Sequence, residues 1–201
     1  MTSNSVRIPI QNRSISKKSK IIKAGFDLIC SKGYHNTNSA EIAKVAGVST
    51  GIVYQYFKDK HDIFIEGMKI YANSIFFPMI VLPDNMEINN NNFDQILDDM
   101  ILKFINNHKL SETAHEEITS MIHSDKEIAD FFKQYELYIS DKITKFLLKN
   151  NIKSDNLAEK VHISLNLIDN LCHEIIYHKH PNMDYEKMKE IVIKTITGLI
   201  L

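Results

Sequence analysis

Three residues in a short stretch of the chain are of the types that contact the base edges of DNA. Thr50, Gly51 and Gln55 follow one another closely, with Val53 and Phe57 at positions expected to face the core. A glutamine can pair with adenine through two hydrogen bonds, and a threonine can offer its hydroxyl or its methyl group. A glycine lets the helix backbone come close to the bases. The stretch therefore predicts sequence-specific contact with a duplex, if it forms a helix that enters the major groove.

The residues around this stretch predict two short helices joined by a tight turn. Asn38 can cap the first helix, with Glu41 completing a capping box, and Gly47 can end it in the left-handed conformation. Ser49 is placed to cap the second helix. A helix, a glycine-containing turn and a second helix make up a helix-turn-helix, which here spans about Asn38 to Phe57.

The string IAKVAGVSTGIVYQYFKDK, residues 42–60, closely resembles the signature of the TetR family of bacterial transcriptional regulators. The shared pattern is I-A, then A-G-V-S, then G-x-x-Y-x-x-F, then K. Gly33, Tyr34, Ile63 and Phe64 also fall where that family places small, aromatic and apolar residues. The resemblance covers roughly the first third of the chain, and it is much denser than a lone short motif.

This resemblance implies an all-α protein with three DNA-binding helices followed by a larger helical ligand-binding and dimerisation domain. It also implies a homodimer that pairs through its last two helices, binds a palindromic operator and responds to a small-molecule effector. Five residues resemble the positions at which the family contacts phosphate: Thr37, Ser49, Tyr54, Tyr56 and Lys60. For Tyr54 and Tyr56 the alternative is core packing of the ring with a hydrated hydroxyl.

The charge distribution agrees with a DNA-facing first part. Residues 1–60 hold ten lysines and arginines against three acidic residues, and the remaining chain holds fourteen against twenty-two. Such asymmetry favours a nucleic-acid-binding domain joined to one of another role, although charge runs can also simply solvate a surface. We expect a flexible basic arm over residues 1–13, a DNA-binding domain over 14–61 and an effector-binding and dimerisation domain over 62–201.

Helical periodicity predicts about nine helices and no strand. The first begins near Ser16. The helix from Asp62 ends at about Phe77, where Pro78 closes or kinks it. The later helices are expected over 93–105, 110–123, 124–149, 154–178 and 184–199, with Ser124 and Ser154 opening two of them. The broad apolar face of the last helix is consistent with a dimer interface.

One helix in the second part carries a polar stripe that could line an effector pocket. Its members are His162, Asn166, Asp169, His173 and Tyr177. A few polar groups on an apolar helix can orient a ligand. The stripe could equally be solvated, or form hydrogen bonds across a dimer. The nine histidines show no regular zinc-ligand spacing, so no metal site and no cofactor are expected.

The sequence lacks the motifs of common enzyme classes and of membrane-spanning proteins. There is no phosphate-binding glycine loop, no nucleophile motif and no bilayer-length apolar run. Cys30 and Cys172 are expected to be reduced, buried thiols of a cytoplasmic protein. We therefore expect a dimeric DNA-binding regulator, a repressor released by a small molecule. The alternatives are control by a protein partner or a metal, activation rather than repression, and an all-helical enzyme.

Overall fold

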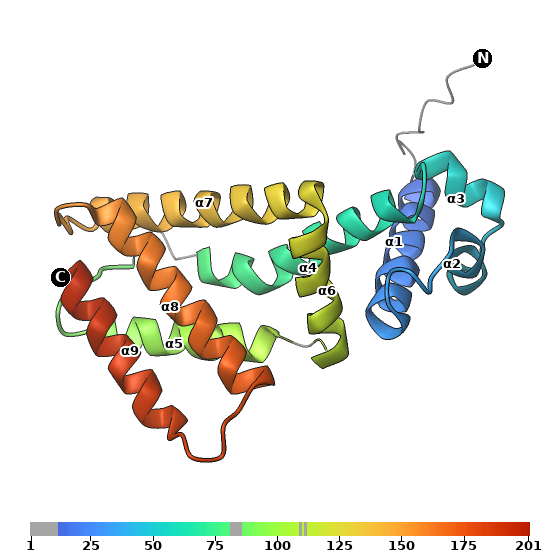
Figure 1. Cartoon of the computed structure of the whole chain (residues 1–201). Coiled ribbons are helices and arrows are strands. Elements are labelled where there is room, and N and C mark those ends of the chain that lie inside the picture. The colour runs from blue at the N-terminus through green and yellow to red at the C-terminus, as the bar shows by residue number, and fades with distance from the viewer. Residues whose placement is uncertain (1–11, 81–85, 109, 111) are drawn as a thin grey trace. The chain divides into compact units, whose positions relative to one another are not determined.

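The computed structural model describes residues 12–80, 86–108, 110 and 112–201, and these residues form nine helices and no strand (Figure 1). This confirms the all-α prediction. The helices are α1 (Asn12–Lys32), α2 (Ser39–Ala46), α3 (Thr50–Tyr56), α4 (Lys60–Ile80), α5 (Phe93–Asn107), α6 (Glu112–Ser124), α7 (Lys126–Lys149), α8 (Leu157–Tyr177) and α9 (Tyr185–Ile200). No helix within the described ranges is long and apolar enough to cross a membrane.

The chain forms two compact units that are interleaved along the sequence. The first contains the residues up to Asn73 together with Leu110–Ala129, and the second contains Ser74–Lys109 and Asp130–Leu201. In the first unit, α1 packs against both α2 and α6, and α2 packs against α3. In the second, α8 and α9 pack together and α5 packs on both. The predicted domain limits did not anticipate that α6 joins the first unit.

The first unit has a core built from α1 to α4. Its fully buried members include Ile21, Ile42, Val53 and Ile63. Phe57 is also buried, which confirms the core positions expected for Val53 and Phe57.

Two glycines allow α1 to approach its neighbours closely. A Cβ on Gly67 of α4 would lie 2.7 Å from Cδ2 and 2.8 Å from Cβ of Phe26 on α1. A Cβ on Gly25 of α1 would collide with the side chain of Ile63. Any larger side chain at Gly67 therefore has to push α1 and α4 apart.

The two caps predicted for α2, Asn38 at its start and Gly47 at its end, are confirmed. The Asn38 side chain accepts a hydrogen bond from the Glu41 N–H at 3.0 Å. Gly47 has φ 68°, and its N–H and that of Val48 bond back to the carbonyls of Lys44 and Ala43 at 3.2 and 3.0 Å. These two bonds make a Schellman motif, which needs a residue that tolerates positive φ.

Two details of the predicted capping were wrong. The Glu41 carboxylate pairs with the Lys32 ammonium, an ion pair that the sequence pattern did not indicate. Ser49 stands at the N-cap of α3, but its side chain makes no capping hydrogen bond. The first turn of α3 is therefore held by its backbone alone, with the N–H groups of Ile52 and Val53 bonded to the Ser49 carbonyl.

Several predicted helix ends were also wrong. Helix α1 already includes Asn12, so Arg13 is helical, while residues 1–11 of the predicted arm lie outside the described residues. Helix α4 continues past Pro78 to Ile80. Proline has no N–H to donate to the fourth residue before it, so Pro78 removes one backbone hydrogen bond from the last turns of α4.

The starts of α7 and α8 differ from prediction, and at α7 a neighbouring residue takes over the cap. Asp125, not Ser124, accepts the N–H groups that open α7, from Glu127 at 2.9 Å and Ile128 at 3.1 Å. The Ser124 hydroxyl instead donates to the Ser120 carbonyl within α6. Ser154 does not open α8, which begins at Leu157 with Asn156 at its N-cap, and the Ser154 Oγ instead accepts a hydrogen bond from Lys160 at 2.6 Å.

The second unit surrounds its core with α5, α8, α9 and most of α7. Phe104, Ile101 and Leu171 are among its most deeply buried side chains. An ion pair of 3.0 Å between Lys189 and Asp98 joins α9 to α5.

Both cysteines are buried and make no disulfide, as predicted. Burial, reinforced by the nearby charge of Asp27 for one and Asp169 for the other, raises the pKa of the Cys30 and Cys172 thiols to about 12. The thiols are therefore protonated and unreactive at neutral pH.

Candidate nucleic-acid interface

Helix α3 presents a polar face to solvent and an apolar face to the core. Gly51, Tyr54 and Gln55 are exposed, and the Tyr54 side chain is 52% exposed. Thr50, the first residue of α3, is partly exposed. Val53, on the opposite face, is completely buried. The three candidate base-contacting residues and Tyr54 therefore lie where a groove-bound helix would need them.

Tyr56 has a different environment from Tyr54. Its side chain is only 5% exposed, and its hydroxyl shares a hydrogen bond of 2.6 Å with Ser14 Oγ near the start of α1. Ser14 is itself buried. This hydrogen bond joins the end of α3 to α1. The ring of Tyr56 therefore packs in the core, which the sequence analysis gave as the alternative to phosphate contact.

Thr37 and Lys60 both stabilise the turn between α1 and α2. The Thr37 side chain is buried and its hydroxyl donates to the Gly33 carbonyl at 3.0 Å. Lys60 Nζ donates to the carbonyls of Tyr34 and Thr37 at 2.5 and 2.9 Å, and it lies 4.3 Å from the centre of the Tyr34 ring. Both residues therefore already have protein partners.

Some exposed basic residues of the first unit have an acidic partner: Lys23 pairs with Asp27, Lys32 with Glu41 and Lys69 with Glu66. A second group, on α1 to α3 and the turn after α3, is exposed and has no acidic side chain within 4 Å among the described residues: Arg13, Lys17, Lys20, Lys44 and Lys58. This second group has its charge available for phosphates.

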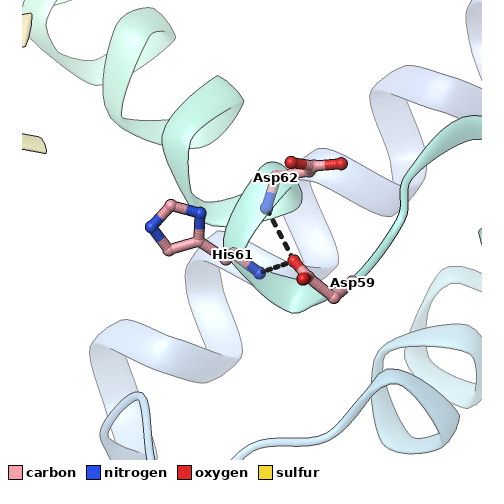
Figure 2. Close-up of side chains that lie close together, drawn as sticks. All are labelled: Asp59, His61 and Asp62. Atoms are coloured by element: carbon pink, nitrogen blue, oxygen red, sulfur yellow. Dashed lines mark hydrogen bonds between the residues drawn. The ribbon is translucent and has the colours of Figure 1, made fainter. Parts of the chain in front are cut away.

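The N-terminus of α4 holds the one His/Asp cluster, among the described residues, whose geometry could suit a metal (Figure 2). Asp59, His61 and Asp62 each offer one ligand atom, and these atoms lie within 4.8 Å of one another. Asp59 Oδ1 accepts the N–H groups of His61 and Asp62 at 2.8 and 3.2 Å, and Asp62 accepts the Lys58 N–H at 2.9 Å. The carboxylates thus serve as helix caps, which explains the cluster without an ion.

Two contacts within the first unit join α6 and the residue after it to the N-terminal helices, and sequence reasoning missed both. The Glu117 carboxylate accepts a hydrogen bond from the Tyr34 N–H. His61 Nε2 lies 2.8 Å from Asp125 Oδ2, directly after α6. Burial acts to raise the pKa of Asp125, but the Ile128 N–H, the His61 ring and the Glu127 N–H together lower it.

The predicted polar stripe on α8 divides into two parts. His162 contacts Ser140 and Glu136 of α7, at 3.3 and 3.6 Å, and Asn166 donates to the His162 carbonyl of its own helix. Further along, Asp169 pairs with His173 at 3.2 Å.

His173 and Tyr177 meet a histidine that the sequence analysis did not single out. The His108 ring centre is 5.1 Å from that of His173, 6.3 Å from that of Tyr177 and 4.2 Å from that of Phe104. His108 Nδ1 also lies 3.1 Å from the Phe104 carbonyl oxygen. The second part of the stripe is therefore a packed polar cluster shared by α5 and α8.

Burial and the neighbouring His173 lower the pKa of His108, against the raising effects of the Phe104 carbonyl and Asp169. A histidine with a lowered pKa stabilises the fold only while it is neutral. Its contribution is complete above the unfolded-state pKa of about 6.5 and is lost as the pH falls toward the folded-state value.

We expect the free energy of unfolding to decrease between pH 7 and pH 5, with His108 contributing a slope of at most about 1.4 kcal/mol per pH unit. His108→Gln should flatten this part of the profile, and urea unfolding at a series of pH values measures the change. Identical profiles for the parent and His108→Gln would show that His108 is as accessible to protons as in the unfolded chain.

Comparison with known proteins gives a consistent result. Residues 21–66 match the sequence model of a family described as bacterial regulatory proteins, tetR family. The fatty acid metabolism regulator protein of Bacillus subtilis is 45% identical over 53 residues, which are 26% of this chain and 27% of that protein. The chain thus matches only about a quarter of the length of such relatives.

The solved structures extend the likeness to the whole fold. A TetR-family protein from Syntrophomonas wolfei has 25% sequence identity and a TM-score of 0.67, with 94% of this chain and 96% of that chain covered. A second, from Mesorhizobium loti, has 18% identity, a TM-score of 0.72 and coverage of 94% and 97%. Residues 21–66 therefore resemble the tetR family of bacterial regulatory proteins in sequence, and the described residues share the helical fold of TetR-family structures.

Proposed function

We propose that the chain is a transcriptional regulator that binds DNA through α3. The observation that carries this proposal is the two-sided character of α3. Thr50, Gly51, Tyr54 and Gln55 face outward, while Val53, Phe57 and the Ser14–Tyr56 hydrogen bond hold the helix in place. The helix is short, so a few outward side chains read the bases while lysines position it on the backbone.

The proposed interface gives different roles to the eight candidate residues. Thr50, Gly51 and Gln55 face the bases, and Tyr54 and Ser49 are exposed for phosphate contact. Thr37, Tyr56 and Lys60 act mainly by fixing the turn and the end of α3, because their polar atoms are bonded within the protein.

The regulator is proposed to act as a homodimer through α8 and α9. Ile163 of α8 and Ile191 of α9 are 51% and 63% exposed, so both helices offer an apolar side chain that a second copy could cover. Two copies of α3 spaced about one turn of the duplex apart can read a palindromic operator. Sedimentation at micromolar concentration should show a dimer, and a monomer there would contradict the dimer proposal.

An effector in the second unit is proposed to release the protein from its operator, which would make it a repressor in the cytoplasm. The ligand must bind the released state more tightly than the bound state, or it shifts nothing. The name of the Bacillus subtilis relative concerns fatty acid metabolism, but its similarity to this chain is confined to 53 residues and so says nothing of the effector here.

The direct test is binding to the DNA upstream of the protein's own gene, measured by fluorescence anisotropy between 50 and 200 mM salt. We expect tight binding at low salt, with an affinity that falls steeply as salt rises, because each phosphate contact contributes a slope of about 0.9. Absence of binding at low salt, or an affinity independent of salt, would contradict the proposal.

Gly51→Ala separates DNA contact from folding. An added Cβ would meet only Ser49 Oγ, at 3.9 Å, so the fold can accept it and helix propensity should improve stability by about 0.5–1 kcal/mol. The same methyl group stands on the face proposed to approach the bases. We therefore expect operator affinity to decrease about tenfold or more while urea unfolding shifts to higher concentration. Unchanged affinity would show that Gly51 does not lie against the duplex.

A further inference from the structure

A polar groove of about 180 Å³ opens on the first unit, between α1, the end of α3, the N-terminal half of α4 and the first turn of α7. The buried side chains of Phe57 and Ile65 form part of its wall. The charged side chains of the wall are Lys18, Asp62, Glu66, Lys69 and Glu127. All of these residues belong to the first unit, so the groove is separate from the effector site proposed for the second unit.

Glu66 engages both lysines of the groove. Its Oε1 lies 3.0 Å from Lys69 Nζ, and its Oε2 lies 3.4 Å from Lys18 Nζ. Burial acts to raise the pKa of Glu66, but the two lysines hold it below its ordinary value. Glu66 is therefore ionised at neutral pH, and each lysine already has a carboxylate partner.

The other two carboxylates of the groove lack such a partner. Within the described part of the chain, neither Asp62 nor Glu127 has a basic side chain within 4 Å. Asp62 Oδ2 accepts the Lys58 N–H at 2.9 Å, which leaves the second oxygen of this carboxylate available. Three carboxylates thus face two lysines, and the groove carries one excess negative charge. A concave surface with such an excess concentrates cations.

The size and the wall of the groove fit a small planar cation. The space holds roughly six non-hydrogen atoms, if each occupies about the 30 Å³ of a water. A guanidinium group has one positive charge and N–H donors on several sides, and its geometry matches carboxylate oxygens. Lys18 Nζ lies 5.6 Å from the centre of the Phe57 ring, so this wall already accepts one cation beside an aromatic ring.

We propose that the groove binds a small organic monocation of the guanidinium type, held by Asp62 of α4 and Glu127 of α7. The bound cation neutralises the excess charge and links the two helices. The dissociation constant should be on the order of 1 mM, because ion pairs at a solvent-exposed rim are weak. The proposal does not depend on DNA binding.

Ethylguanidinium is the probe for this site, and N-ethylurea, the uncharged molecule of similar shape, is its control. In methyl-labelled protein at constant ionic strength, ethylguanidinium should shift the NMR signal of Ile65 in a saturable manner. The signal of Ile96, in α5 of the second unit, should not move. N-ethylurea should leave both signals in place. Equal shifts with the two compounds, or no saturable shift of Ile65, would overturn the proposal.

Two exposed charges allow a test in which the affinity changes in opposite directions. Glu127→Gln should weaken ethylguanidinium binding about fivefold, and Lys69→Gln should strengthen it by a similar factor because it increases the negative excess. Glu190→Gln, at an exposed position of α9, is the matched control and should change nothing. Loss of folding cannot produce a gain in affinity, so Lys69→Gln keeps the test decisive.

Three results would contradict the assignment of the ligand class. The first is the same affinity for ethylguanidinium in the parent, Glu127→Gln and Lys69→Gln. The second is a saturable shift of Ile65 with sodium acetate, which would show that the groove selects anions. The third is a shift with magnesium chloride at lower concentration than with ethylguanidinium, which would make the groove a metal site.

Discussion

Phe64→Ala is expected to lower the free energy of unfolding by about 3–5 kcal/mol, a large share of the stability of an ordinary domain. The Phe64 side chain is completely buried in α4. Its ring centre lies 6.0 Å from that of Phe26 on α1 and 5.9 Å from that of Tyr34 in the turn before α2. Removing the ring leaves a cavity where three segments meet, and close packing around Gly67 limits how far they can collapse.

Urea unfolding measures this effect, and Ile70→Ala is the matched control on the same helix. Ile70 is 57% exposed, so its truncation should change stability by no more than about 0.5 kcal/mol. Phe64→Leu keeps part of the volume and should fall between the two. A loss below about 1 kcal/mol for Phe64→Ala would show that this region relaxes freely and that the three segments are not held by a common core.

Lys60→Gln is expected to cost about 2–3 kcal/mol of stability without reducing the salt dependence of DNA binding. Lys60 Nζ bonds to two backbone carbonyls and lies over the Tyr34 ring. Hydrogen bonds from a charged donor are stronger than neutral ones, and without the lysine the carbonyls of Tyr34 and Thr37 lose their charged donor, although the Tyr34 carbonyl still accepts from the Thr37 N–H at 3.4 Å. The turn that positions α2 should therefore loosen.

Lys58→Gln is the control, because Lys58 is exposed two residues earlier and should change stability by about 0.5 kcal/mol or less. Anisotropy titrations at several salt concentrations give the other half of the test. If Lys60→Gln is as stable as the parent and its salt slope decreases by about 1, then Lys60 is a phosphate ligand. In that case its bonds to the turn contribute little.

Local signals in the sequence were sufficient to predict the two motif helices. The Asn38 side chain accepts from an N–H three residues later, and the Gly47 N–H donates to a carbonyl three residues earlier. The residues that define the ends of α2 therefore lie within a few positions of one another in the sequence. The start of α7 shows the limit of such signals. Ser124 and Asp125 are both good capping residues, and only the backbone geometry, aided by His61, selects Asp125.

Contacts between distant residues could not be predicted in the same way. Ser14 and Tyr56 are 42 positions apart, His61 and Asp125 are 64 apart, and Tyr34 and Glu117 are 83 apart. No periodicity or motif relates the members of these pairs, because each pair exists only after the helices have packed. For the same reason the sequence predicted the polar stripe on α8, but it did not predict that His108, at the end of α5, packs against His173 and Tyr177 of that stripe.

The interleaved order of the two units has a consequence for how the protein is made and cut. The chain leaves the first unit after Asn73 and returns to it between Leu110 and Ala129. During synthesis, the DNA-facing unit therefore cannot be completed until Ala129 has left the ribosome, well after its three N-terminal helices have emerged. A protease cut between the two passages would leave α6 attached to α1 by noncovalent packing alone, and a fragment that ends before Leu110 would lack α6 altogether.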